Sequence, residues 1–87
     1  MDSFKVEIKN SFERDLKKID IRFIPQILEV IESLSDNPFP VQSKKLKGSE
    51  ASYRLRIGDY RIIYQVNTPS KLIVVYYVRH RKDAYKH

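Results

Sequence analysis

"YRLRIGDYRIIYQV", residues 53–66, decides the fold, because apolar and polar residues alternate on both sides of a single Gly-Asp pair. This alternation is typical of two half-buried strands, and a two-residue loop at Gly58-Asp59 would join them as a tight hairpin. Counting outward from that loop sets Arg56 directly opposite Arg61. Like charges placed opposite each other destabilise a sheet by roughly a few tenths of a kcal/mol. This arginine pair therefore needs an explanation.

The two faces of this hairpin carry different side chains. One face is apolar and aromatic, with Tyr53, Leu55, Ile57, Tyr60, Ile62, Tyr64 and Val66. The other carries three arginines, Arg54, Arg56 and Arg61, while Asp59 lies in the turn. Because a guanidinium can donate two hydrogen bonds to one phosphate, this face predicts a phosphodiester site that also stabilises a pentavalent transition state. The alternative is a solvated basic surface, since exposed charges are screened within about 8 to 10 Å at physiological salt.

The segments before the hairpin predict one strand and two helices. Alternation from Phe4 to Ile8 indicates a short strand, and Asn10 offers an N-cap for a first helix. Because proline is tolerated only in or near the first turn of a helix, Pro25 predicts a break between about residues 20 and 24. An apolar stripe then marks a second helix, with Ile24, Ile27, Leu28, Ile31 and Leu34.

The remaining segments complete the predicted sheet. Residues 38–52 have turn chemistry at both ends and predict a connecting loop. Residues 72–78 are apolar on both faces, which predicts a central strand from Lys71 to about Arg79 with both sides covered. The predicted fold is α+β in the order β-α-α-β-β-β, with a two-helix hairpin on one face of a mainly antiparallel four-stranded sheet. A chain of 87 residues predicts a single domain, residues 1–87.

Composition excludes several kinds of site. The chain has no cysteine, so disulfides and Cys-ligated zinc are excluded, and the composition fits a reducing cytosol. Its two glycines cannot build a Gly-rich phosphate loop, and its two histidines give no metal-ligand spacing. The longest apolar run, of seven residues, cannot span a bilayer. We expect a cytoplasmic protein with no membrane association, metal or cofactor.

Positive charge is concentrated in the second half of the chain. Residues 1–43 contain six Lys/Arg and eight Asp/Glu, net −2, whereas residues 44–87 contain eleven Lys/Arg and three Asp/Glu, net +8. A segregated basic surface attracts polyanions, so RNA, DNA or an acidic protein are the natural partners. The C-terminal stretch "RHRKDAYKH", residues 79–87, leaves the predicted central strand, so its first residues should lie near the arginines. We expect His80 and Lys82 to add contacts to RNA.

Three stretches together resemble a known family. "KKLKG" at residues 44–48, the hairpin "YRLRIGDYRIIYQV" and "VRHRKDAY" at residues 78–85 are similar to toxins of the RelE/ParE superfamily from bacterial and archaeal toxin-antitoxin pairs. The resemblance runs from about Phe4 to Tyr85. It implies cleavage of messenger RNA in the ribosomal A site without a metal, by attack of a ribose 2′-OH on the adjacent phosphate. It also implies a cognate acidic RelB-like antitoxin, through which the complex would bind operator DNA.

The resemblance also implies roles for individual residues. Arg54 and Arg56 match the two basic strand positions of the family, and Arg61 matches the arginine after the hairpin turn, where it would stabilise the phosphate. Arg81 matches the arginine past the last strand, where it would stabilise the phosphate or protonate the leaving oxygen, and Tyr85 would stack on or orient the target base. The loop lysines Lys44, Lys45 and Lys47 would contact ribosomal or messenger RNA backbone.

One departure from the family pattern leaves the general base open. The two strand positions are commonly lysine in the family, and a lysine with a depressed pKa can act as a base, whereas arginine is effectively never deprotonated. Either Arg54 and Arg56 act electrostatically while His80 or another group takes the proton, or activity is weak. Two other functions stay open: a ParE-type inhibitor of DNA gyrase, and a non-catalytic toxin that mainly binds its antitoxin.

Overall fold

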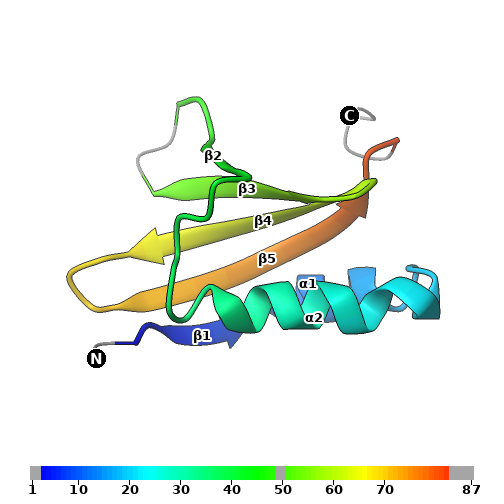
Figure 1. The fold of residues 1–87 in the computed structure, drawn as a ribbon, viewed down its shortest axis with the longest axis horizontal. Coiled ribbons are helices and arrows are strands. Elements are labelled where there is room, and N and C mark those ends of the chain that lie inside the picture. Colours follow the sequence, from blue (N-terminus) through cyan, green and yellow to red (C-terminus); the bar gives the residue numbers. More distant parts are fainter. Residues whose placement is uncertain (1–2, 49–50, 83–87) are drawn as a thin grey trace.

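The computed structural model describes residues 3–48 and 51–82 and contains two helices on one face of a five-stranded sheet (Figure 1). The sheet has the strand order β1-β5-β4-β3-β2. Along the chain the elements are β1 (Lys5–Ile8), α1 (Asn10–Leu16), the 3₁₀ turn η1 (Ile21–Phe23), α2 (Ile24–Ser33), β2 (Ser43–Lys45), β3 (Ser52–Ile57), β4 (Tyr60–Asn67) and β5 (Leu72–His80). The predicted α+β class is confirmed, and so is the break before Pro25, where η1 precedes α2.

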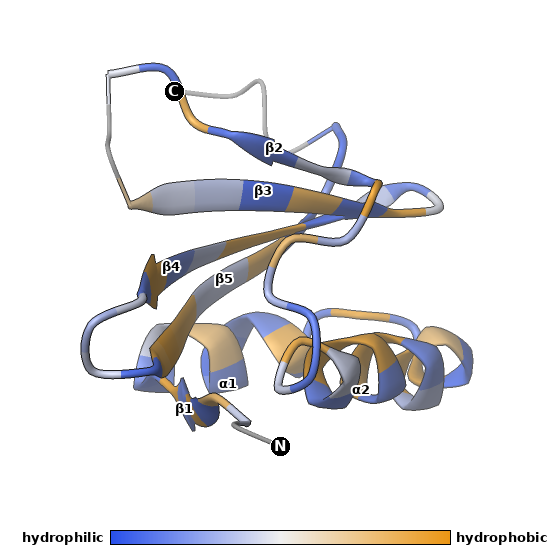
Figure 2. Cartoon of the chain, turned by 60° about the vertical axis from the view of Figure 1, so that its left-hand side comes forward, coloured by the Kyte–Doolittle hydropathy of each residue, from blue (hydrophilic) through white to orange (hydrophobic). Residues whose placement is uncertain are grey.

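The predicted number of strands is wrong by one, because part of the predicted connecting loop is a strand. β2 pairs antiparallel with β3, with Lys44 opposite Arg54 and Lys45 opposite Tyr53. Figure 2 shows why the sequence gives no signal here: β2 is short and hydrophilic, so it lacks an apolar alternation. Its strand conformation comes from hydrogen bonding to the edge of β3 rather than from its own side chains.

β5 is central, as predicted, between a parallel partner and an antiparallel one. It pairs with β1 in parallel from Lys5 opposite Leu72 to Ile8 opposite Val75, and with β4 along its whole length. The prediction that both of its faces are covered is wrong. Both helices pack on the same face, and the side chain of Tyr77 on the other face is 36% exposed. We call this uncovered side of the sheet the open face.

The core lies between the helices and the sheet face that the alternation assigned to it. The most deeply buried side chains are Phe12, Ile27, Leu34, Leu55, Ile62, Tyr64, Ile73, Val75 and Val78. Alternate residues of β3 and β4 therefore enter the core, while the arginines between them face away from it. No helix in the described part of the chain is long and apolar enough to cross a membrane.

Lys9 and the side chains of α1 form hydrogen bonds with the backbone groups at the edge of β5, beyond the point where β1 ends. The Lys9 amide donates to the Val75 carbonyl at 3.0 Å, so the helix begins at the next residue, and the prediction of Asn10 as its N-cap is wrong. The Ser11 hydroxyl then donates to the Tyr76 carbonyl at 2.6 Å, and the Asp15 carboxylate accepts from the Val78 amide at 3.3 Å. Side chains of α1 thus replace the hydrogen bonds that a longer β1 would have made.

Replacing Tyr64 with phenylalanine should destabilise the fold by about 1–3 kcal/mol, because a buried acceptor loses its donor. The Tyr64 hydroxyl donates to the Pro38 carbonyl at 2.8 Å, and burial raises the pKa of Tyr64. Tyr76→Phe is a matched control, since its hydroxyl donates to Gln65 at an exposed position and at 3.2 Å. Urea unfolding followed by circular dichroism measures both variants, and equal losses would contradict this account.

Candidate functional site

The hairpin has the register that the sequence predicts. Gly58 lies in the left-handed region at φ 57°, which a tight two-residue loop requires and which glycine adopts without a steric penalty. Arg56 stands directly opposite Arg61. Their Cβ atoms are therefore about 5 Å apart by the geometry of an antiparallel pair. The two like charges lie side by side on the open face.

The line of arginines that begins with Arg56 and Arg61 continues onto a third strand. Arg61 of β4 stands opposite Arg79 of β5, so Arg56, Arg61 and Arg79 form a line across three strands, which we call the arginine row. A second line runs parallel to it, with Lys44 opposite Arg54, Arg54 opposite Ile63, and Ile63 opposite Tyr77. The open face is consequently basic over β2 and β3 and both basic and aromatic over β5.

A small hollow of about 70 Å³ lies at the centre of the basic part of this face. Its lining consists of Gln42, Lys44, Arg54, Arg56 and Arg61. Arg54 and Arg61 are half-buried and Arg56 is exposed, so their positions are fixed by the sheet while their charge still reaches solvent. The structure therefore brings together three of the predicted catalytic arginines and one predicted RNA-binding lysine.

Arg79 belongs to this surface, as expected for the first residue of the stretch 79–87, although sequence analysis assigned it no individual role. The register of β4 and β5 shifts between Ile63 and Tyr64, which marks a β-bulge in β5. Without the bulge, strict alternation from Ile73 and Val75 would place Arg79 on the helix-covered face. The Asp15 carboxylate lies 3.6 Å from Nε of Arg79, which gives the row a fixed third member at the edge of β5.

Arg81 lies at the same end of the sheet as the arginine row. Its backbone amide donates to the Asp59 carbonyl at 2.6 Å, which continues the pairing of β4 and β5 and holds Arg81 beside the hairpin turn. Lys82 follows directly and is exposed, and its amide donates to Nδ1 of His80 at 3.2 Å. The predicted base-stacking residue Tyr85 lies outside the described residues.

The family model described as "ParE toxin of type II toxin-antitoxin system, parDE" matches residues 6–85. The chain belongs to the RelE/ParE toxin superfamily. It is 37% identical over 86 residues to the RelE1 protein of Methanocaldococcus jannaschii, covering 95% of this chain and 96% of that protein. It is 36% identical over 85 residues to toxin RelE3 of the same organism, covering 93% and 94%. A chain of the archaeal RelE-RelB complex from Pyrococcus horikoshii superposes with a TM-score of 0.80 at 30% identity, covering 91% of this chain and 96% of that one.

These findings make the chain the toxin of a type II toxin-antitoxin system, of the RelE type. The basic hairpin that carries the resemblance in sequence is also where this RelE-type toxin concentrates its arginines in space. Within the described residues of the toxin, no group of three or more His, Asp or Glu side chains lies close enough to hold a metal ion.

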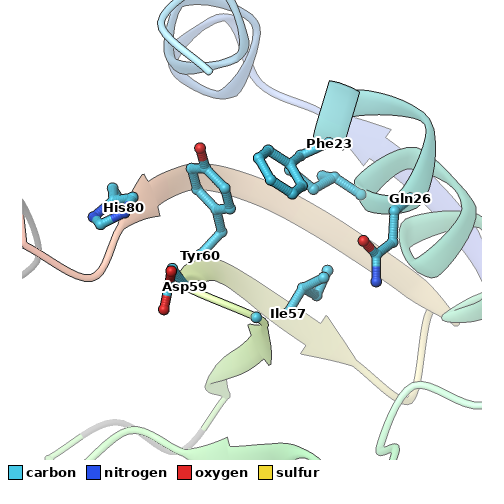
Figure 3. Close-up of a pocket in the computed structure, with 8 residues that line it drawn as sticks. Phe23, Gln26, Ile57, Asp59, Tyr60 and His80 are labelled. Atoms are coloured by element: carbon cyan, nitrogen blue, oxygen red, sulfur yellow. The ribbon is translucent and has the colours of Figure 1, made fainter. Parts of the chain in front are cut away.

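His80 of the toxin lies on the face opposite the arginine row. It stands opposite Tyr60, whose side chain points toward the helices, and Figure 3 shows the Tyr60 ring between His80 and Phe23. The ring centroids are 5.3 Å apart for Tyr60 and His80 and 5.7 Å apart for Phe23 and Tyr60. These aromatic contacts line a hollow of about 220 Å³ on the helix side. The structure therefore does not bring His80 to the arginines.

The loop lysines of the toxin are separated as well. Lys44 shares the open face with Arg54, whereas Lys45 stands opposite Tyr53 and belongs to the other face of β2. Lys47 lies in the turn after β2, beyond the paired part of the sheet. Alternation along a three-residue strand thus gives neighbouring lysines different surroundings.

Proposed function

We propose that residues 1–87 act as a single toxin domain that cleaves messenger RNA on the ribosome without a metal ion. The observation that carries the proposal is the cross-strand pairing of Arg56 with Arg61 beside Lys44 and Arg54, with Arg81 next to the hairpin turn. A surface that concentrates fixed positive charge at one point suits a phosphodiester, which gains negative charge as it reacts. The site of action would be the cytoplasm, where ribosomes and messenger RNA meet.

The proposed reaction divides into charge stabilisation and proton transfer. The ribose 2′-oxygen attacks the adjacent phosphorus, the bond from phosphorus to the 5′-oxygen breaks, and the products are a cyclic phosphate and a 5′-hydroxyl. Arg56 and Arg61 would neutralise the phosphorane oxygens, and Arg54 would bind the neighbouring phosphate. Arg81 would donate a hydrogen bond to the leaving oxygen, which takes its proton from water because the guanidinium keeps its own. Tyr85 would stack on the target base.

The other predicted contacts serve binding rather than chemistry in this proposal. Lys44 adjoins the hollow and would contact the phosphate backbone of the messenger. Lys45, Lys47 and Lys82 are exposed around the edge of the sheet and would contact ribosomal or messenger RNA. Contacts with the phosphate backbone strengthen binding with little dependence on the nucleotide sequence of the RNA.

The 2′-hydroxyl proton has no evident acceptor among the arginines, because a guanidinium stays protonated at any physiological pH. His80 is the remaining candidate base of the prediction, but its ring packs against Tyr60 on the face opposite the arginine row. We infer that the proton passes to water while the arginines lower the barrier electrostatically.

His80→Phe should therefore leave the cleavage rate within about threefold of wild type. The substitution removes the imidazole nitrogens and keeps an aromatic ring against Tyr60. A general base contributes about 10²- to 10⁴-fold to a rate, so single-turnover cleavage of ribosome-bound messenger would detect its loss easily. A drop of more than about 100-fold, or a pH dependence of the wild-type rate that the variant lacks, would assign the proton transfer to His80.

Expression under tight control, with mapping of messenger 5′ ends on stalled ribosomes, tests the proposed activity. We expect new 5′-hydroxyl ends within codons at the A site soon after induction. Growth arrest with intact messengers would contradict the proposal.

A ParE-type inhibitor of DNA gyrase is the second candidate, and the observation that favours it is the family model itself, which is described as a ParE toxin. The basic set of Arg54, Arg56, Arg61 and Arg81 argues for the RelE type instead. Inhibition of supercoiling by the purified chain, without messenger cleavage, would reverse this order. A toxin that is folded but harmless at high expression would be a non-catalytic binder of its antitoxin.

An acidic RelB-like antitoxin should abolish cleavage when it is mixed with the toxin in equal amounts. The relative from Pyrococcus horikoshii is seen in a RelE-RelB complex, and an acidic, partly disordered partner would wrap the basic half of this chain and fold on binding. We propose that it covers the arginine row and that the complex binds operator DNA through the antitoxin. Undiminished cleavage by the stoichiometric complex would exclude such masking.

A further inference from the structure

The bulge in β5 turns two consecutive tyrosines toward the same face. Ile63 stands opposite Tyr77 and Tyr64 opposite Val75, so Tyr76 is the extra residue of the bulge. In a regular strand neighbouring side chains point to opposite faces. Here the Tyr76 hydroxyl donates to Oε1 of Gln65, which belongs to the open face, and Tyr77 lies next to Ile63 on that face. The bulge thus builds an aromatic surface that alternation alone would not give.

These tyrosines adjoin the arginine row through Arg79. The guanidinium carbon of Arg79 lies 4.4 Å from the centroid of the Tyr77 ring, and the Tyr76 and Tyr77 centroids are 6.4 Å apart at an interplanar angle of 35°. The Asp15 carboxylate lies 3.6 Å from Nε of Arg79 and helps to hold its guanidinium. Tyr77 is 36% exposed, so solvent reaches this assembly. We call Tyr77 and Arg79 the stacking pair.

The chemistry of the stacking pair matches an unpaired nucleobase beside a phosphate. Bases stack on aromatic rings and on guanidinium planes, whatever their identity, because every base has a π-face. Arg61 stands opposite Arg79 and can bind the phosphate of the same nucleotide. A protein partner with an apolar surface would gain little from a face on which three arginines stand in line. The charge of the open face therefore favours a single-stranded polyanion that also carries bases.

We propose that the stacking pair binds an unpaired base of single-stranded RNA next to the phosphate held at the arginine row. Tyr76 braces the ring of Tyr77, and Asp15 holds the guanidinium of Arg79. The inference rests on the proposed function in taking RNA as the ligand of the open face, but it concerns binding and is independent of cleavage. It adds a base-binding position made by residues of β5, in addition to the role proposed for Tyr85.

Comparing the binding of two ligands distinguishes base stacking from attraction between charges. The first is an unstructured RNA of about eight nucleotides, within the usual size range for single-strand sites, with every 2′-hydroxyl methylated so that it cannot be cleaved. The second is inorganic polyphosphate of the same charge, which has no bases. Binding of the full chain to each is measured by fluorescence anisotropy with labelled RNA and by competition with polyphosphate.

Tyr77→Ala should weaken binding of this RNA about 5- to 150-fold and leave polyphosphate binding unchanged. Tyr77→Phe should bind both ligands as wild type does. Arg79→Gln should weaken the binding of both ligands. It should also reduce the slope of log K against log salt concentration for RNA binding by about 0.7. Arg14→Gln, which removes an exposed charge from α1, should stay within about twofold of wild type. Thermal melts confirm that each variant is folded.

The inference is overturned if Tyr77→Ala binds the RNA as tightly as wild type, or if the substitution weakens the binding of RNA and of polyphosphate equally. It is also overturned if the wild-type chain does not bind the RNA at low salt. A Tyr77→Ala chain that keeps RNA binding but loses its antitoxin would assign the surface to a protein partner and would also overturn it. Tyr77-dependent RNA binding by a chain that cuts no messenger on ribosomes would refute the proposed cleavage alone.

Discussion

The double variant Arg61→Ala, Arg81→Ala should lose messenger cleavage by at least about 10³-fold. Removing a single preorganised donor that faces developing charge costs about 10²- to 10³-fold in rate. Arg61 stands within the arginine row and Arg81 beside the hairpin turn, so they would contact different oxygens of the reacting phosphate. Because residues that act as a unit are not additive, the expected loss is stated as a lower limit.

Single-turnover cleavage of ribosome-bound messenger gives the rate of this variant, and colony formation after induction gives its toxicity. Arg14→Ala with Lys18→Ala is the control for net charge, since it also removes two positive charges, in this case from two exposed positions. The control should remain active and toxic. Equal toxicity of the Arg61 and Arg81 double variant, with cleavage persisting, would show that the catalytic site has been assigned to the wrong residues.

The hairpin and its arginine pair could be predicted because the information is local. A Gly-Asp loop fixes the register of two strands that follow each other directly, and alternation then assigns each side chain to a face. Arg56 opposite Arg61 follows from that register alone. The strand β2 could not be predicted in the same way, since its three residues carry no apolar pattern and depend on pairing with β3.

One bulge accounts for most of what the sequence did not reveal about the site. Residues 72–78 are apolar throughout, so no change of alternation marks the extra residue at Tyr76. Strict alternation would put His80 on the open face and Arg79 on the covered face, whereas the shifted register exchanges them. The same shift turns Tyr77 to the open face, beside Tyr76. A single backbone irregularity therefore decides which side chains of β5 lie beside Arg61 on the open face.

Phe12→Ala should destabilise the toxin by about 3–5 kcal/mol, the usual cost of removing a fully buried phenylalanine. Phe12 is completely buried on α1, between Ser11 and the turn that carries Asp15, whose side chains hydrogen-bond to β5. A small domain is stable by only about 5–15 kcal/mol, so a cavity here removes a large part of the total. Loosening α1 would also release the edge of β5 that supports Arg79.

Phe39→Ala supplies the comparison, because it makes the same chemical change at a position that is 45% exposed and edge-stacked on Tyr53 with centroids 5.1 Å apart. Phe39→Ala should lower the free energy of unfolding by about 1 kcal/mol, in the range of a single aromatic pair. Urea unfolding followed by circular dichroism gives both free energies of unfolding. Equal losses in free energy of unfolding for the two variants would mean that α1 does not anchor the core. The position of Asp15 beside Arg79 would then have to be fixed by something other than the packing of Phe12.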